Sequence, residues 1–200
     1  MEETDRNRRL RVLHLASGGL IAAFLLVHLA NHLAMFAGQA AHIAVMEHVR
    51  PLYRNWVVEP LLMVALLFQV GSGLTMIWRT RTTRAGWLAW LQAGSGVVLA
   101  LFLVNHVGSV WAGRLTLGLD TNYHFAAAGF HAGLSAFFAP YYLAGVAALF
   151  IHLACALAWR LRSRMIPALL AIGGIALAIG FVATMWSDPA IPQSYRDTYL

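Results

Sequence analysis

The 200-residue chain is 60% hydrophobic and only 11% charged, which excludes an ordinary soluble globular protein. Its basic residues are 14 arginines without a lysine, and they contribute to a net charge of +6. We attribute this charge to membrane topology and not to nucleic-acid binding, because most of the arginines gather in short segments beside apolar stretches.

Five apolar stretches are long enough to cross a bilayer core, which takes about 20 residues of helix. In chain order they are Leu15–Gly38, Val57–Trp78, Trp87–Gly113, Phe137–Trp159 and Met165–Trp186. Backbone groups must be satisfied internally in lipid, and stretches of this length favour helices over barrel strands. The sequence therefore predicts an all-α membrane protein, with one up-down bundle of five helices over residues 1–200.

The arginines predict the orientation of these helices. Ten of the 14 lie in residues 6–11, 79–84 and 160–164, at the N-terminus and after the second and fourth stretches. By the positive-inside rule, the N-terminus is expected in the cytoplasm and the C-terminus outside. The two remaining connections, Gln39–Trp56 and Arg114–Ala136, are longer and partly apolar. We expect short interfacial helices or caps there.

A repeat links the first and third stretches. Four of its positions recur 78 residues later: Ser17, Gly18, Phe24 and His28 return as Ser95, Gly96, Phe102 and His106. Helical rise places His28 roughly 15 Å and His106 roughly 12 Å from the outer surface. A histidine at such depth is costly and indicates a functional site. We call this position the outer level and predict that the two histidines ligate one cofactor.

A second polar position, the inner level, lies nearer the cytoplasmic face. Gln69 and His152 are there, roughly 12–15 Å from that face. Two imidazoles on one iron give a low-spin haem suited to electron transfer, and glycines such as Gly18 and Gly73 are expected to leave space for it. The alternative for each of these residues is a hydrogen bond between helices without a cofactor. His32, one turn beyond His28, is a second candidate ligand or a propionate partner.

The longer connection after the first stretch adds a charged cluster. Arg50 and Arg54 are four residues apart and are expected to meet haem propionates or a quinone headgroup. Glu59 begins the second stretch and is a candidate proton acceptor for quinol chemistry. Its alternative role is an acidic residue that interacts with the positive end of a helix dipole.

With these residues assigned, the chain resembles the five-helix cytochrome b membrane anchors of succinate dehydrogenase and fumarate reductase. The resemblance rests on the Ser-Gly…Phe…His repeat, the chain length and the histidines of the first, third and fourth stretches. It implies that His28 and His106 ligate a distal haem b and that His152 is one proximal ligand. The chain departs from the family at Gln69, where the second proximal ligand is expected, so one or two haems are implied.

The resemblance also implies partners and a location. A flavoprotein and an iron–sulfur protein would dock on the cytoplasmic face of a bacterial inner membrane, and a membrane quinone would exchange electrons with the haem. The chain itself would transfer electrons and would not act on the dicarboxylate. Two alternatives stay open. One is a haem-free structural or transport protein, and the other is a stand-alone one-haem quinone oxidoreductase with Glu59 in its site.

Overall fold

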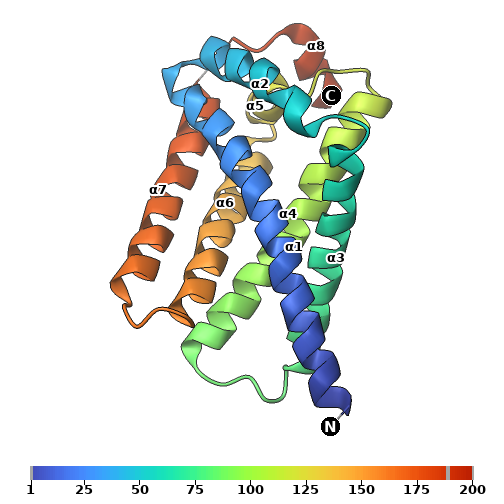
Figure 1. Cartoon of the computed structure of the whole chain (residues 1–200). Helices are drawn as coiled ribbons and strands as arrows, with labels where there is room; N and C mark the ends of the chain where they lie inside the picture. The colour runs from blue at the N-terminus through green and yellow to red at the C-terminus, as the bar shows by residue number, and fades with distance from the viewer. Residues whose placement is uncertain (1, 188–189, 200) are drawn as a thin grey trace. The chain divides into compact units, whose positions relative to one another are not determined.

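The structure is a computed structural model in which residues 2–187 and 190–199 are described. It is 84% helical, and no strand occurs within these described ranges. The α-helices, labelled in Figure 1, are α1 (Glu2–Leu33), α2 (Gln39–Tyr53), α3 (Val58–Arg79), α4 (Trp87–Leu115), α5 (Tyr123–His131), α6 (Ser135–Ala158), α7 (Met165–Ser187) and α8 (Gln193–Arg196). Two short 3-10 helices, η1 (Ala34–Ala37) and η2 (Asp197–Tyr199), follow α1 and α8.

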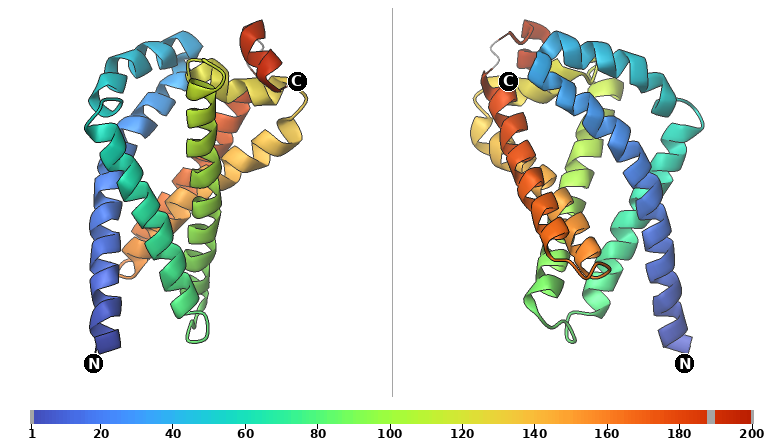
Figure 2. Two further views of the ribbon diagram at one scale, coloured as in Figure 1. Left: turned by 90° about the vertical axis from the view of Figure 1, so that its right-hand side faces the viewer. Right: turned by 60° about the vertical axis from the view of Figure 1, so that its left-hand side comes forward.

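Five of these helices are long and apolar enough to cross a membrane, as predicted: α1, α3, α4, α6 and α7. The ends of the last four lie within two residues of the predicted ends. The first helix is different, because it already begins at Glu2 and includes the arginines of residues 6–11. Figure 2 shows α1 as one continuous helix in both views.

The chain forms two compact units, which we call unit 1 (Met1–Thr82) and unit 2 (Thr83–Leu200). In unit 1, α1 packs along α3, and α2 packs against both α1 and η1. The chain turns back between η1 and α2 at Gly38, whose φ of 107° is a conformation that glycine adopts without strain. Asn55 closes the turn that leads into α3, because its side-chain oxygen accepts hydrogen bonds from the backbone N–H groups of Val57 and Val58.

In unit 2, α6 packs against both α4 and α7. Small residues allow these close approaches, since a Cβ atom at Gly145 would overlap Phe102 and one at Gly174 would overlap Phe150. The short helix α5 lies against α6, α7 and α8. Its residue Tyr123 is 1% exposed.

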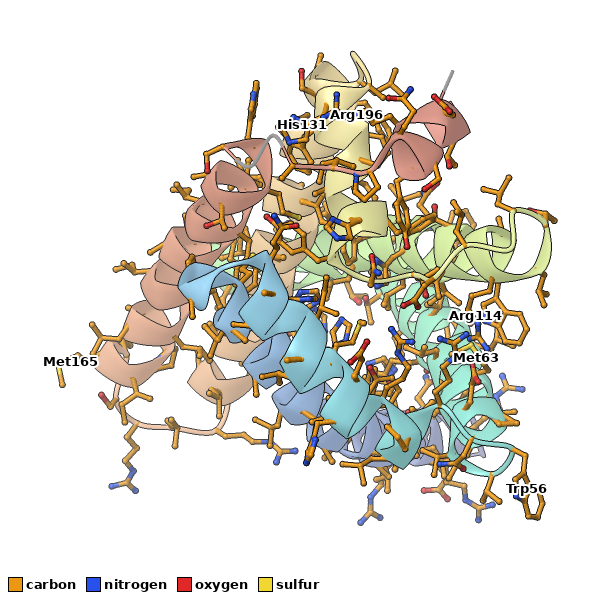
Figure 3. The ribbon with its side chains drawn as sticks, turned by 90° about the horizontal axis from the view of Figure 1, so that it is seen from above. Trp56, Met63, Arg114, His131, Met165 and Arg196 are labelled. Atoms are coloured by element: carbon orange, nitrogen blue, oxygen red, sulfur yellow. The ribbon has the colours of Figure 1, made fainter. Side chains whose placement is uncertain are left out.

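The two longer connections form helices, as predicted, namely α2 in unit 1 and α5 in unit 2. Apolar side chains remain exposed along all five long helices, which is the surface a lipid-facing helix needs. Trp56 extends away from the ribbon in the loop between α2 and α3 and is 89% exposed (Figure 3). Tryptophans at such positions are typical of membrane–water interfaces.

Candidate functional site

The sequence repeat at the outer level is also a structural repeat. In unit 1 the rings of Phe24 and His28 are stacked, with centroids 5.2 Å apart and an interplanar angle of 24°. In unit 2 the rings of Phe102 and His106 are stacked at 5.3 Å and 12°. In each helix the phenylalanine lies one turn before the histidine, where side chains four residues apart meet. The phenylalanine therefore restricts the orientation of the imidazole in the same way in both units.

Each of these phenylalanines also contacts a tyrosine. Tyr53 of α2 packs edge-on against Phe24, with centroids 5.2 Å apart. Tyr141 of α6 packs against Phe102 at 4.9 Å, and its hydroxyl donates to the Phe102 carbonyl at 3.2 Å. Gly145 leaves the space that Phe102 occupies. In both units, a second helix thus holds the phenylalanine that orients the histidine.

Unit 1 adds a chain of imidazoles at this level. His28 Nε2 lies 3.2 Å from His32 Nε2, and His32 Nδ1 lies 3.2 Å from His42 Nε2. The buried Asn31 places its side-chain nitrogen 3.4 Å from the same His42 nitrogen. Burial lowers the pKa of His42 to about 4. Because His28 and His32 face each other through Nε2, ligation by His28 Nε2 requires that this contact opens.

The inner level of unit 1 is a closed hydrogen-bond network. Ser72 donates its proton to the Phe68 carbonyl at 2.6 Å, so its oxygen accepts from His14 Nδ1 at 2.7 Å. His14 Nε2 then carries the lone pair and accepts from the Gln69 amide at 3.0 Å. The carbonyl oxygen of Gln69 accepts from Ser17 at 2.5 Å. The side-chain nitrogen and oxygen of Gln69 are therefore both hydrogen-bonded within unit 1.

Sequence reasoning missed His14. It stands one residue before Leu15, where the apolar pattern predicts the first stretch to begin, although α1 already begins at Glu2. The sequence held a signal, since His14 lies three residues before Ser17 and 78 residues before Gln92. The equivalent position of the repeat, 92, holds a glutamine, so a polar residue recurs at this position of α1 and α4.

Two glycines do not leave the space expected for a macrocycle. A Cβ atom at Gly18 would lie 3.2 Å from the Gln69 side-chain nitrogen, and one at Gly73 would lie 3.3 Å from His14 Cε1. These glycines accommodate the network of unit 1. By contrast, no heavy atom lies within 4 Å of a Cβ placed at Gly71 or Gly94.

The inner level of unit 2 is built around His152. Its Nδ1 lies 3.1 Å from the Gln92 carbonyl and 3.2 Å from the Ser95 hydroxyl. Ser95 donates to the same carbonyl at 3.0 Å, so His152 Nδ1 must carry a proton that it donates. Nε2 then carries the lone pair, and no described residue hydrogen-bonds to it. An imidazole held by Nδ1–H with Nε2 open is the arrangement of a metal-ligating histidine, so His152 fits a haem.

The charged cluster of α2 lines a shallow surface hollow formed by Glu47, Arg50, Pro51 and Arg54. The two arginines, predicted as neighbours one turn apart, both line this hollow. Arg50 also contacts the sulfur of Met46 at 3.1 Å. Glu59 lies half-buried in the first turn of α3, where a carboxylate interacts favourably with the helix dipole. Its proton-accepting role stays a prediction.

The remaining histidines belong to α2 and α5. His48 is exposed, and His131 places Nε2 2.9 Å from the Met185 carbonyl. Across residues 2–187 and 190–199, no group of three or more His, Cys, Asp or Glu side chains could hold a metal ion. This observation concerns ions held by protein side chains alone, and a haem iron needs only axial ligands from the protein.

The chain matches no protein-family model, no curated protein and no solved structure. A functional assignment therefore depends on the residues and contacts described above.

Proposed function

We propose that the chain is the cytochrome b membrane anchor of a complex similar to succinate dehydrogenase or fumarate reductase. His28 and His106 are its outer-level haem ligands, and His152 is an inner-level ligand. Haem b, when bound, supplies a one-electron carrier. The protein passes electrons between iron–sulfur and flavin subunits and a membrane quinone. The observation that carries this proposal is the Phe–His stack that recurs in both units.

The stacks support ligation because they restrict the ligands before the cofactor binds. An imidazole that is free to rotate loses side-chain entropy when it binds a metal. Phe24 and Phe102 reduce that loss, since each restricts the ring next to it in advance. A histidine that serves only as a hydrogen bonder needs no such repetition across two helices. His152, with Nδ1–H on a carbonyl and Nε2 open, adds an independent argument for a haem.

The α2 hollow is the proposed place for polar groups of a propionate or a quinone. Arg50 and Arg54 line this hollow, and a planar guanidinium group is well suited to donate hydrogen bonds to carboxylate oxygens. Glu59, at the start of α3, is proposed to accept the proton that a quinol releases. The chain's residues thus bind and orient the quinone and take up its proton.

The proposed orientation follows from the arginines. The N-terminus lies in the cytoplasm of a bacterium, the C-terminus lies outside, and the chain spans the inner membrane five times. The flavoprotein and the iron–sulfur protein dock on the arginine-rich face and carry the dicarboxylate chemistry. This chain takes no part in that chemistry.

The first test is a reduced-minus-oxidised optical spectrum of the purified protein, together with a pyridine haemochrome assay. We expect a b-type α-band, which H28A and H106A each weaken by removing the outer-level haem. H48A is the matched control, because His48 is exposed on α2 and has no proposed role. Wild-type protein without haem, purified from cells supplied with haem precursors, would contradict the proposal.

A second candidate function is a haem-free structural or transport protein. The contacts between His14 and Gln69 and between His28 and His32 favour it, because they pair these side chains within the protein. The same spectrum separates the two candidates. If haem is present, native electrophoresis distinguishes the anchor from a stand-alone quinone oxidoreductase, since only the anchor migrates with flavin and iron–sulfur subunits.

A further inference from the structure

Ser17 of α1 has two alternative hydrogen-bond acceptors in the inner-level network of unit 1. Its hydroxyl donates to the side-chain oxygen of Gln69 at 2.5 Å, and it lies 3.1 Å from the backbone carbonyl of His14. A hydroxyl has one proton and can rotate it toward either acceptor, while its oxygen remains able to accept. Ser17 can therefore change from donor to acceptor toward Gln69 without moving its oxygen atom.

Gln69 of α3 has a matching freedom. Its side-chain nitrogen donates to His14 Nε2 at 3.0 Å, and its oxygen accepts from Ser17. A half-turn of the terminal amide group exchanges this donor and this acceptor in nearly the same space, because the oxygen and the NH₂ group are similar in size. After the half-turn, the oxygen faces His14 and the nitrogen faces Ser17.

This rotated arrangement is the one that a doubly protonated His14 requires. A neutral imidazole accepts at one nitrogen, whereas an imidazolium donates from both. With the amide rotated, His14 Nε2–H donates to the Gln69 oxygen. The Gln69 nitrogen then donates to Ser17, which turns its own proton to the His14 carbonyl. His14 Nδ1–H keeps its bond to Ser72 at 2.7 Å in both states, so each hydrogen bond is replaced without a change in the backbone.

We propose that the inner-level network of unit 1 is a proton-binding site, in which the Gln69 amide rotates as His14 Nε2 takes up a proton. The proton comes from solvent, since His14 is only half-buried, and no electron is transferred. Hydrogen bonds donated by an ionised group are stronger than neutral ones, so the network stabilises the charge that it takes up. The inference goes beyond the proposed function, because its four side chains lie in unit 1 and none is a proposed haem ligand.

The charged groups of α1 and α3 lie outside the network. On α1, the arginines of residues 6–11 precede His14, and the nearest of them, Arg11, is exposed, so that solvent weakens its repulsion of an imidazolium. On α3, Arg79 donates to Asn7 of α1 at 2.7 Å, and Glu59 lies in the first turn, at the opposite end of the helix.

The other two elements packed against α1 in unit 1 add no charge at this level. The 3-10 helix η1 has no titratable side chain. α2 follows η1 and packs near the far end of α1, where His42 contacts His32. The titratable side chains of α2 therefore belong to the outer level: His42, Glu47, His48, Arg50 and Tyr53.

The test is nitrogen-15 NMR of the full chain in detergent micelles with labelled histidine. The pH is lowered from about 8 to about 5, the range in which imidazole side chains titrate. The His14 signal is assigned through the α-protons of Gly73, because a Cβ atom at Gly73 would lie 3.3 Å from His14 Cε1. We expect Nδ1 to be protonated throughout and Nε2 to gain a proton reversibly.

The variant Q69M keeps the length of the side chain but cannot exchange a donor for an acceptor. It should bind the second proton about tenfold more weakly, since one hydrogen bond from a charged donor is lost. The matched control is T75V, which also removes a polar group from α3. The Thr75 hydroxyl donates to Gly71 at 2.7 Å within the same helix, so T75V should titrate like the wild type.

Two results would overturn the inference. If Nε2 stays unprotonated in the wild type down to about pH 5, the network is a neutral lock between α1 and α3. If Q69M titrates like the wild type and T75V, the Gln69 amide does not stabilise the proton. If Q69M yields no folded protein, S17A decides in the same way, because it removes the acceptor of the rotated amide. Haem content enters none of these outcomes, so the proposed function stands or fails separately.

Discussion

Units 1 and 2 are alike at the outer level and differ at the inner level. At the outer level, the same Phe–His stack is present on α1 and on α4. At the inner level, unit 1 has its histidine, His14, on α1 and its glutamine, Gln69, on α3. Unit 2 has the opposite order, with Gln92 on α4 and His152 on α6. The stack is a contact within one helix, so repeating the sequence repeats the geometry. The inner cluster forms between two helices, and its contacts differ: His14 pairs with the side chain of Gln69 in unit 1, whereas His152 pairs with the backbone carbonyl of Gln92 in unit 2.

The units also differ in how they place their short helices and how tightly they pack. Unit 1 starts α2 with the backbone turn at Gly38 and no side-chain cap, whereas unit 2 starts α5 with the side chain of Asn122. A Cβ atom at Gly145 or Gly174 of unit 2 would lie 2.1 Å from an aromatic side chain, whereas the closest approach of such an atom to a side chain among the described glycines of unit 1 is 3.2 Å, at Gly18. Unit 2 should therefore be the more sensitive to added volume.

The largest expected effect is a loss of folding stability at acidic pH, and it arises from His42 in unit 1. Burial lowers the pKa of His42 to about 4, below its ordinary value of 6.5. Between these values the unfolded state binds more protons, so stability falls as the pH drops from about 6.5 and levels off below about 4. At about 1.4 kcal/mol per pKa unit, the loss reaches about 3 kcal/mol.

The variant H42N should remove this component of the pH dependence, and H48N should leave it unchanged because His48 is exposed. The measurement is unfolding by a denaturing detergent at a series of pH values. An identical acid slope in wild type and H42N would show that other groups cause the loss.

The next effect is steric and belongs to unit 2. G174A places a methyl group where Phe150 already lies, and overpacking of this kind costs about 1–3 kcal/mol. The paired variant G71A meets no heavy atom within 4 Å, and replacing a helical glycine with alanine should stabilise unit 1 by about 0.5–1 kcal/mol. Thermal unfolding followed by circular dichroism measures both. Equal shifts in the two variants would remove the proposed packing difference.

The smallest effect concerns the start of α5. Asn122 accepts hydrogen bonds from the backbone N–H groups of His124 at 2.9 Å and Phe125 at 3.4 Å. N122A should lower stability by about 1 kcal/mol, the usual cost of losing such a cap. N122D keeps the accepting oxygen and serves as the control. Hydrogen exchange in α5 locates the effect, and unchanged exchange in N122A would contradict it.

Apolar length was enough to predict the spanning helices, because a stretch of about 20 apolar residues has few alternatives. It was not enough to find the start of α1. Charged residues end the apolar pattern there, yet arginine is a good helix former and Asp5 precedes Arg9 by one turn. His14 therefore lies outside the first stretch that the apolar pattern predicts.

Contacts within one helix were predictable from the helical period, whereas contacts between helices were not. His32 lies one turn from His28, and the sequence placed them on one face. The contact between His32 and His42 depends on the turn at Gly38, which directs α2 back toward α1. The tautomers of His14 and His152 depend on serines and carbonyls that only the folded helices bring together.

The unbroken α1 has a mechanical consequence. Measured along its axis, this 32-residue helix is about 48 Å long, whereas the hydrocarbon core of a bilayer is about 30 Å thick. In the proposed orientation, a stem of roughly 18 Å that bears the arginines of residues 6–11 projects from the membrane. A tilt or torque applied to this stem by a docked protein reaches His14 without a hinge. One residue inserted between Arg11 and His14 would turn the arginines by about 100° around the helix axis relative to the histidine. The continuous helix therefore fixes the direction of the arginines relative to that of His14.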